Sequence, residues 1–109
     1  MVKKTISKKL ENKIYEYVRI LKEDKLPIKR VILFGSRAKG VQNKWSDVDL
    51  CIISPKFKNA FNALRYLSSK VIFDMKYTIE AVGFSPRDFS NKYDTLISEI
   101  KNTGIEIKI

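Results

Sequence analysis

The sequence contains no histidine, a single cysteine and no long apolar run. Without histidine, His-based zinc sites, catalytic triads and histidine general bases are excluded. The lone Cys51 excludes an internal disulfide, and its position between Leu50 and Ile52 is typical of an inert core residue. No apolar stretch approaches the roughly 18 residues of a membrane span, and no signal-peptide core is visible, so we expect a cytoplasmic protein with no membrane partner. Chemistry in this chain therefore has to use carboxylates, hydroxyls, lysines, arginines and a bound metal.

Acidic residues are also scarce, with 12 against 22 basic residues and a net charge of +10. This balance favours polyanionic partners such as a nucleoside triphosphate, RNA or an acidic protein. A generally lysine-rich surface explains the charge equally well, and the lysines of the first predicted helix fit a solvated face better than a nucleic-acid patch. Direct nucleic-acid binding is therefore not favoured. A length of 109 residues predicts one domain, residues 1–109, without a separate substrate-recognition domain.

Hydrophobic spacing predicts alternating helices and strands. The expected elements are a helix at 6–24, a strand at 30–34, a short helix from Ser36, a strand at 47–53, a helix at 57–71, a strand at 76–82, a helix from 86 to about 103 and an edge strand at 105–109. Thr5 or Ser7 is suited to cap the first helix, Ser85 with Pro86 to begin the last one, and Gly104 to end it. This order predicts a compact α/β (α+β) domain of one sheet with packed helices.

Two short motifs carry the chemistry. Gly35-Ser36 follows a predicted buried strand, and a turn of this kind can bring backbone N–H groups close to phosphate. Asp47 and Asp49 alternate on a strand, so their carboxylates project to the same face and suit a cation such as Mg²⁺. Each motif alone has a commoner explanation, an ordinary turn in the first case and a solvated strand end in the second.

The two motifs together, separated by the ten residues 37–46, resemble the Gly-Ser-x10-Asp-x-Asp signature of the polymerase β-like nucleotidyltransferase superfamily. More narrowly, the chain resembles the minimal nucleotidyltransferases, the MNT-type antitoxins encoded beside HEPN-domain partners. This resemblance rests on the segments Phe34–Gly40 and Ser46–Leu50 and on the small size of the chain. The closing segments 82–86 and 104–105 are similar as well, so the resemblance spans nearly the whole chain. It implies one mixed sheet of about four strands with packed helices.

The resemblance also implies a third carboxylate on a later strand, for which Glu80 is the candidate. Glu80 alternates with Ile79 and Ala81 just before the end of the predicted strand. Asp74 is the second choice, although it precedes that strand and fits a loop or cap better. Many members of the family carry aspartate at the place of Glu80, and here the side chain is longer.

By the same resemblance, Asp47, Asp49 and Glu80 are the expected catalytic residues and would hold Mg²⁺, as two ions. The implied reaction moves a nucleoside monophosphate from a triphosphate to a hydroxyl, with pyrophosphate as the leaving group. Glu80 would complete the metal site and could accept the proton of the attacking hydroxyl.

The implied nucleotide-binding residues are Gly35 and Ser36 at the β and γ phosphates, with Arg37 and Lys39 neutralising the leaving pyrophosphate. Arg37 has a competing explanation as a surface or strand-pairing residue, and for Lys39 the two explanations weigh the same. Trp45 could stack on a base, but a hydrophobic plug beneath its loop explains it better.

The family resemblance favours adenylylation of a hydroxyl on a HEPN-domain toxin, with ATP as substrate and this chain as the antitoxin. One alternative keeps the chemistry and changes the acceptor to a small molecule or an RNA end. Another is a non-catalytic antitoxin that neutralises its partner by contact alone, assisted by its basic surface. The acceptor therefore has to be identified from a partner.

Overall fold

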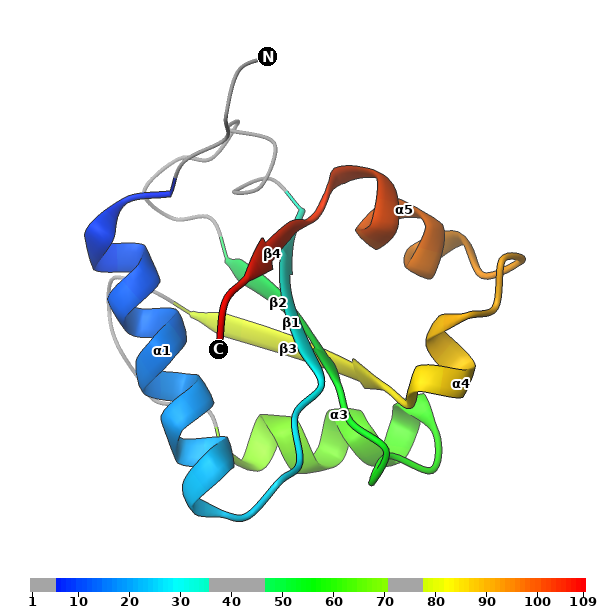
Figure 1. Cartoon of the computed structure of the whole chain (residues 1–109), viewed down its shortest axis with the longest axis horizontal. Helices are drawn as coiled ribbons and strands as arrows, with labels where there is room; N and C mark the ends of the chain where they lie inside the picture. The colour runs from blue at the N-terminus through cyan, green and yellow to red at the C-terminus, as the bar shows by residue number, and fades with distance from the viewer. Residues whose placement is uncertain (1–5, 36–46, 71–77) are drawn as a thin grey trace.

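The computed structural model describes residues 6–35, 47–70 and 78–109. In chain order its elements are α1 (Lys8–Glu23), β1 (Arg30–Phe34), β2 (Val48–Ile53), α3 (Ala60–Ser69), β3 (Ile79–Phe84), α4 (Pro86–Phe89), α5 (Thr95–Thr103) and β4 (Ile105–Ile107) (Figure 1). The short helix predicted from Ser36 lies outside the described residues. The α+β class is as the sequence predicted.

The four strands form one mixed sheet in the order β3-β2-β1-β4. Strand β1 pairs antiparallel with both β2 and β4, whereas β2 and β3 are parallel. The parallel pair is joined through α3, as a parallel connection requires a crossover. Strand β4 lies at one edge, as the alternation of Ile105, Glu106 and Ile107 predicted.

Helices cover the two faces of the sheet unequally (Figure 1). The long helix α1 and α3 pack on one face, with Val48, Leu50 and Ile52 of β2 beneath them. The short helices α4 and α5 pack on the other face, against residues that include Cys51 and Ile53. Because side chains alternate along a strand, Asp49 belongs to the α4–α5 face.

The N-terminal caps follow the sequence closely. The Ser7 hydroxyl accepts a hydrogen bond from the backbone N–H of Leu10 at 3.2 Å and begins α1. Helix α3 begins at Ala60, later than the predicted residue 57, because the side chain of Asn59 caps it by accepting from Asn62. The start predicted for α3 was therefore wrong by three residues.

The outward positions of α3 also differ from the prediction. Helical spacing from Phe57 predicts Phe61 and Leu64 on the buried face, but both are exposed, whereas Ala63 and Leu67 are fully buried. Phe57 lies before the helix and still packs in the core. A later helix start shifts which residues face the sheet, and the smaller Ala63 takes the position nearest to β3.

The single helix predicted from residue 86 to about 103 is instead two helices. Ser85 caps α4 as expected, but Ser90 ends that helix, and Asp94 begins α5 by accepting from the N–H of Ile97 at 3.0 Å. Helical spacing from Phe89 predicts Tyr93 on the buried face, but Tyr93 lies in the connection and is 84% exposed. Gly104 is the C-cap of α5, as predicted.

Strand β3 continues through Gly83 to Phe84, so the strand end predicted at residue 82 was wrong. A Cβ atom at Gly83 would approach Ala63 to 2.8 Å and the Phe57 ring to less than 3.0 Å. Glycine is therefore required here for α3 to pack closely on the strand.

Tyr17 joins the two helices of the main core and provides a test of it. Its ring is fully buried, its hydroxyl donates to the carbonyl oxygen of Leu67 at 2.8 Å, and burial raises its pKa well above the ordinary value. We expect Tyr17→Phe to lower the free energy of unfolding by about 1 kcal/mol and the melting temperature by about 5 °C. Thermal unfolding followed by circular dichroism measures the change. Tyr15→Phe, on the exposed side of the same helix, is the matched control, and equal effects of the two substitutions would contradict this role.

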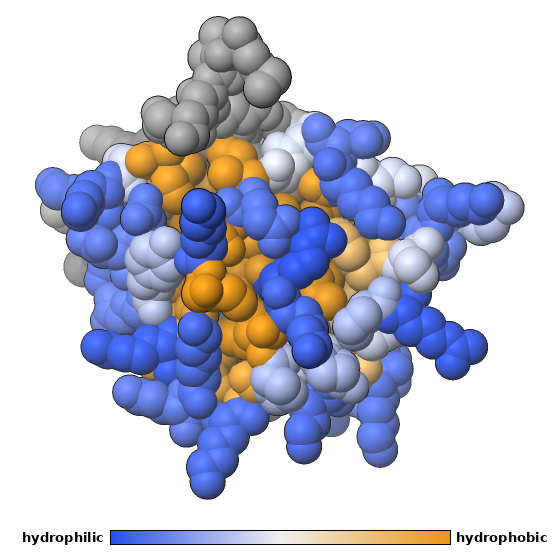
Figure 2. Space-filling model, in the orientation of Figure 1, coloured by the Kyte–Doolittle hydropathy of each residue, from blue (hydrophilic) through white to orange (hydrophobic). Residues whose placement is uncertain are grey.

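The edge of the sheet at β4 faces the viewer in Figure 1, between α1 and the α4–α5 side. In the same orientation, Figure 2 shows hydrophobic surface in the middle of this face, surrounded by hydrophilic side chains. Strand β4 has three residues, which limits the pairing it can offer to another strand. Among the helices of the described ranges, none combines the length and the apolar character needed to cross a bilayer.

Candidate active site

The three predicted acids come together at one end of the sheet. Asp49 of β2 and Glu80 of β3 are direct register partners in the parallel pair. Asp47 lies two residues before Asp49, where Val48 is held by its N–H bond to the Thr78 carbonyl at 2.8 Å. All three side chains therefore project to the α4–α5 face. The backbone pairing of β2 with β3, rather than any loop, fixes this arrangement.

Burial and mutual repulsion together raise the pKa of two of the three carboxyl groups. Half-burial raises the pKa of Asp49, and the charges of Asp47 and Glu99 raise it further. The charge of Asp47 is the largest cause that raises the pKa of Glu80, followed by burial, by Asp49 and by a side-chain hydrogen bond with Asp47. Like charges this close favour a bound proton or a bound cation.

Gly35 lies directly across from this cluster, after the last residue of β1. Its φ is +78°, in the left-handed region that favours glycine. A Cβ atom at this position would collide with Oδ2 of Asp49 and would lie 3.2 Å from its Cγ. The absence of a side chain thus leaves room for the Asp49 carboxylate and exposes the backbone of the turn to a ligand.

The donor set fits a hard divalent cation. Carboxylate oxygens are the ligands that Mg²⁺ prefers, and a cation would offset the burial and the repulsion that raise the two pKa values. Within residues 6–35, 47–70 and 78–109, no three acidic, histidine or cysteine side chains are already arranged as a metal site. Because Asp47 and Glu80 are exposed, their side chains are free of core packing and can turn toward a shared cation.

The remaining predicted residues of the site belong to stretches that the structure does not describe. Ser36, Arg37, Lys39 and Trp45 lie in the stretch 36–46, and Asp74 lies in the stretch 71–77. Of the predicted phosphate-binding turn, only Gly35 is therefore placed.

Glu99 of α5 is a neighbour of the site that the sequence did not indicate. Its negative charge contributes to the raised pKa of Asp49. The helix that carries it packs on β1, which explains how a residue so late in the chain reaches the site. In the sequence, Glu99 is marked only by its place in the predicted helix between the apolar residues Ile97 and Ile100. That place does not show which strand the helix packs against.

Cys51 takes no part in the site. Its side chain is fully buried under the α4–α5 layer, and burial raises the pKa of the thiol to about 12. A thiol in this state is neither a nucleophile nor a metal ligand at neutral pH. The prediction of an inert core residue is confirmed.

Comparison with known proteins agrees with this geometry. Residues 14–107 match the nucleotidyltransferase domain family. A protein of Methanocaldococcus jannaschii named "Putative protein adenylyltransferase MJ0141" is 31% identical over 101 residues, covering 84% of this chain and 99% of that protein.

Two solved structures share the fold. A crystal structure described as a "putative nucleotidyltransferase from Sulfolobus solfataricus" has a TM-score of 0.64 at 17% identity, covering 90% of this chain and 78% of the other. The crystal structure of a toxin-antitoxin with AMP-PNP has a TM-score of 0.57 at 20% identity, covering 90% of this chain and 72% of the other. The match over most of the chain, the archaeal relative and the shared fold show that this chain belongs to the nucleotidyltransferase domain family.

Proposed function

We propose that this nucleotidyltransferase uses Mg²⁺ and ATP to transfer AMP to a hydroxyl group of a protein partner, and that it acts as the antitoxin of a HEPN-domain toxin. The observation that carries the proposal is the cluster of Asp47, Asp49 and Glu80 on one sheet face, opposite the side-chain-free backbone of Gly35. Acids gathered on one face in this way are typical of a site built for a cation.

Two comparisons support the finer parts of the proposal. The relative from Methanocaldococcus jannaschii, which matches over nearly its whole length, is named "Putative protein adenylyltransferase MJ0141". One fold neighbour is a toxin-antitoxin solved with AMP-PNP, an ATP analogue. Both favour a protein as the acceptor over a small molecule or an RNA end. Both also favour an adenine nucleotide as the donor.

In the proposed reaction, the acceptor oxygen forms a bond to the α-phosphorus of ATP, and the bond from that phosphorus to the pyrophosphate breaks. Two Mg²⁺ ions held by these carboxylates would supply positive charge at the triphosphate and at the attacking oxygen. Asp47 and Asp49 orient the reacting groups by holding that charge in place. Glu80 accepts the proton of the attacking hydroxyl.

The phosphate end of the substrate is assigned to the turn after β1. Gly35 offers its backbone without an obstructing side chain. The sequence assigns Ser36, Arg37 and Lys39 to the same phosphates, and these assignments remain predictions. Charge-assisted hydrogen bonds from such groups would stabilise the leaving pyrophosphate.

Labelled ATP tests the proposal. The protein is incubated with Mg²⁺, the partner encoded beside it, and ATP labelled either at the α or at the γ phosphate. We expect label on the partner from the α position only, which separates nucleotidyl transfer from kinase activity. Chelation of the metal with EDTA should abolish the label.

Two variants sharpen the experiment. Asp47→Ala should give no label, whereas Glu23→Gln, an exposed acid at the end of α1, should label the partner as the wild type does. Co-purification of Asp47→Ala with the partner shows that its docking surface is intact. Label from the γ position, or equal label with Asp47→Ala, would refute the proposal, and full neutralisation of the toxin by Asp47→Ala would show that contact suffices.

A further inference from the structure

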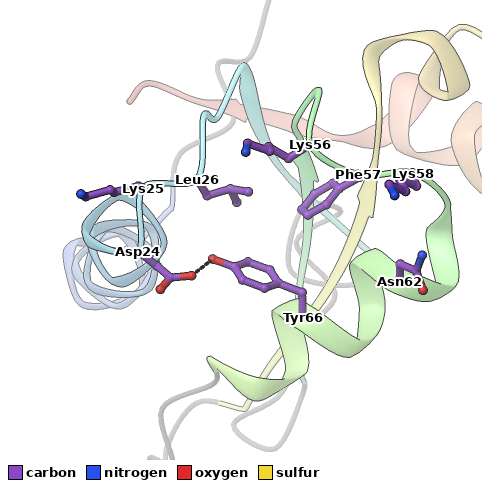
Figure 3. Close-up of a pocket in the computed structure, with 8 residues that line it drawn as sticks. All are labelled: Asp24, Lys25, Leu26, Lys56, Phe57, Lys58, Asn62 and Tyr66. Atoms are coloured by element: carbon purple, nitrogen blue, oxygen red, sulfur yellow. Dashed lines mark hydrogen bonds between the residues drawn. The ribbon is translucent and has the colours of Figure 1, made fainter.

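A pocket lies at the opposite end of β2 from the acids (Figure 3). Its volume is about 480 Å³, within the range of small-ligand sites in proteins. Asp24–Leu26 at the end of α1 form one wall, Lys56–Lys58 after β2 a second, and Asn62 with Tyr66 of α3 a third. Asp49 lies near the start of β2, and the four residue steps from Asp49 to Ile53 separate it from the pocket end of the strand by about 13 Å.

Hydrogen bonds hold the backbone of two of these walls. After α1, Lys25 adopts φ +64°, and the N–H groups of Lys25 and Leu26 bond back to the carbonyls of Lys22 and Leu21 at 2.9 and 3.1 Å. This is a Schellman ending with lysine in the position that usually holds glycine. It turns Leu26 toward the pocket and directs the Lys25 side chain away from it (Figure 3).

The second wall is organised by Ser54, a fully buried polar residue. Its hydroxyl accepts from the N–H of Lys56 at 3.2 Å, and its carbonyl accepts from the N–H of Phe57 at 3.2 Å. The Phe57 ring then points into the pocket opposite Leu26 (Figure 3). The pocket is therefore largely preformed, which lowers the entropy lost when a ligand binds.

The interior of the pocket combines aromatic rings with positive charge. The rings of Phe57 and Tyr66 lie 6.3 Å apart and are tilted by 56°. Within the described part of the chain, no acidic side chain pairs with the ammonium group of Lys56 or Lys58. The charge of these two lysines is thus available to a ligand.

The acid in the pocket, Asp24, is already engaged. Its carboxylate accepts a hydrogen bond from the Tyr66 hydroxyl and forms an ion pair with Lys70 at 3.5 Å. The bond from Tyr66 is the main cause that lowers the pKa of Asp24. Asp24 therefore anchors the Tyr66 ring, and the ion pair with Lys70 offsets the charge that its carboxylate keeps.

We propose that this pocket binds a planar organic anion of mononucleotide size, with its planar part against Phe57 and Tyr66 and its phosphate between Lys56 and Lys58. Flat rings pack on aromatic side chains, and exposed ammonium groups bind phosphate as point charges. The side-chain amide of Asn62 can donate to and accept from the edge of a base. A nucleoside monophosphate has these three features, and the site is separate from the proposed catalytic one.

Adenosine monophosphate in EDTA is the probe, followed by amide chemical shifts of the labelled protein. We expect shifts at Phe57, Asn62 and Tyr66. The double variant Lys56→Ala/Lys58→Ala should bind more weakly by about tenfold or more, because two charge-assisted contacts to phosphate are lost. The double variant Lys92→Ala/Lys108→Ala has the same net charge and should bind as the wild type does. Thermal unfolding confirms that each variant is folded.

Two partial ligands test the chemical class. Adenosine without phosphate, and inorganic phosphate without a base, should each bind more weakly than the nucleotide. Inorganic phosphate that binds as tightly as the nucleotide would overturn the assignment of a planar ligand. Shifts confined to Gly35 and Asp49, or equal affinity of both double variants, would overturn the pocket itself. Adenosine monophosphate should still bind to Asp49→Asn. The pocket can therefore be confirmed or rejected independently of the proposed catalytic function.

Discussion

Asp49→Asn is expected to abolish transfer of the α-phosphate label and, in the same variant, to make the metal-free protein more stable. The loss of activity should be at least about 100-fold, because a bound cation contributes several kcal/mol to catalysis of this kind. The gain in stability has a separate cause. Asparagine keeps the shape of the side chain and removes the charge that Asp47 and Glu99 repel.

The sign of the pH dependence follows from the direction of the shift. The pKa of Asp49 is raised in the folded protein, so the folded chain holds this proton to a higher pH than the unfolded chain does. Stability therefore falls as the pH rises from the ordinary carboxyl pKa through the raised one, and the loss is complete above the raised pKa. Glu80 acts in the same direction. Asp24, whose pKa is lowered, acts in the opposite direction and loses its contribution in acid.

Melting temperatures of the wild type and Asp49→Asn between pH 3 and 8 in EDTA isolate the effect, because the contribution of Asp24 cancels in their difference. We expect no difference in acid and an advantage for the variant that grows to a plateau at neutral pH. Added Mg²⁺ should stabilise the wild type more than the variant. Glu23→Gln is the control and should show neither effect. A variant that is less stable than the wild type at neutral pH would contradict the repulsion inferred for this site.

Gly35→Ala is expected to lower the free energy of unfolding by about 2–3 kcal/mol and to remove most of the activity. Part of the loss comes from the left-handed φ of +78°, which alanine adopts with difficulty. The rest comes from the collision between the new Cβ and Oδ2 of Asp49. If the turn moves to relieve the collision, the backbone that would face the phosphates is displaced. If the carboxylate moves instead, Asp49 leaves its position in the site.

A double-mutant cycle with Asp49→Ala separates the two causes. Removal of the carboxylate relieves the collision but leaves the backbone strain, so Gly35→Ala should destabilise the Asp49→Ala background less than the wild type. Chemical denaturation of the four proteins gives the coupling energy. Equal losses in both backgrounds would show that backbone strain acts alone and that Gly35 and Asp49 are not in contact.

The sequence predicted the elements of the sheet better than the helices around it. The strands at residues 30–34 and 47–53 were marked by short apolar runs between Pro27, Gly35 and Pro55. The break between α4 and α5 was missed because the hydrophobic spacing continues across it. Asp94 and Asn91 carried the signal, since both accept hydrogen bonds from the backbone two or three residues ahead and so compete with a continuous helix.

The sequence predicted the individual motifs of the site, but not how the strands bring them together. The Gly-Ser and Asp-x-Asp motifs are short-range patterns, and the strand alternation of Asp47 and Asp49 follows from them. That Glu80 is the register partner of Asp49 depends on the parallel pairing of two strands, which a single sequence does not specify. The approach of Glu99 depends in addition on where α5 crosses the sheet.

The strand order has a consequence for synthesis of the protein on the ribosome. Strand β1 is the first strand made, yet one of its two neighbours, β4, is the last. Until residues 105–107 have emerged, β1 keeps one row of backbone N–H and C=O groups without a strand partner. The side of the nascent sheet that will later carry β4 is therefore open to other chains until residues 105–107 have been made.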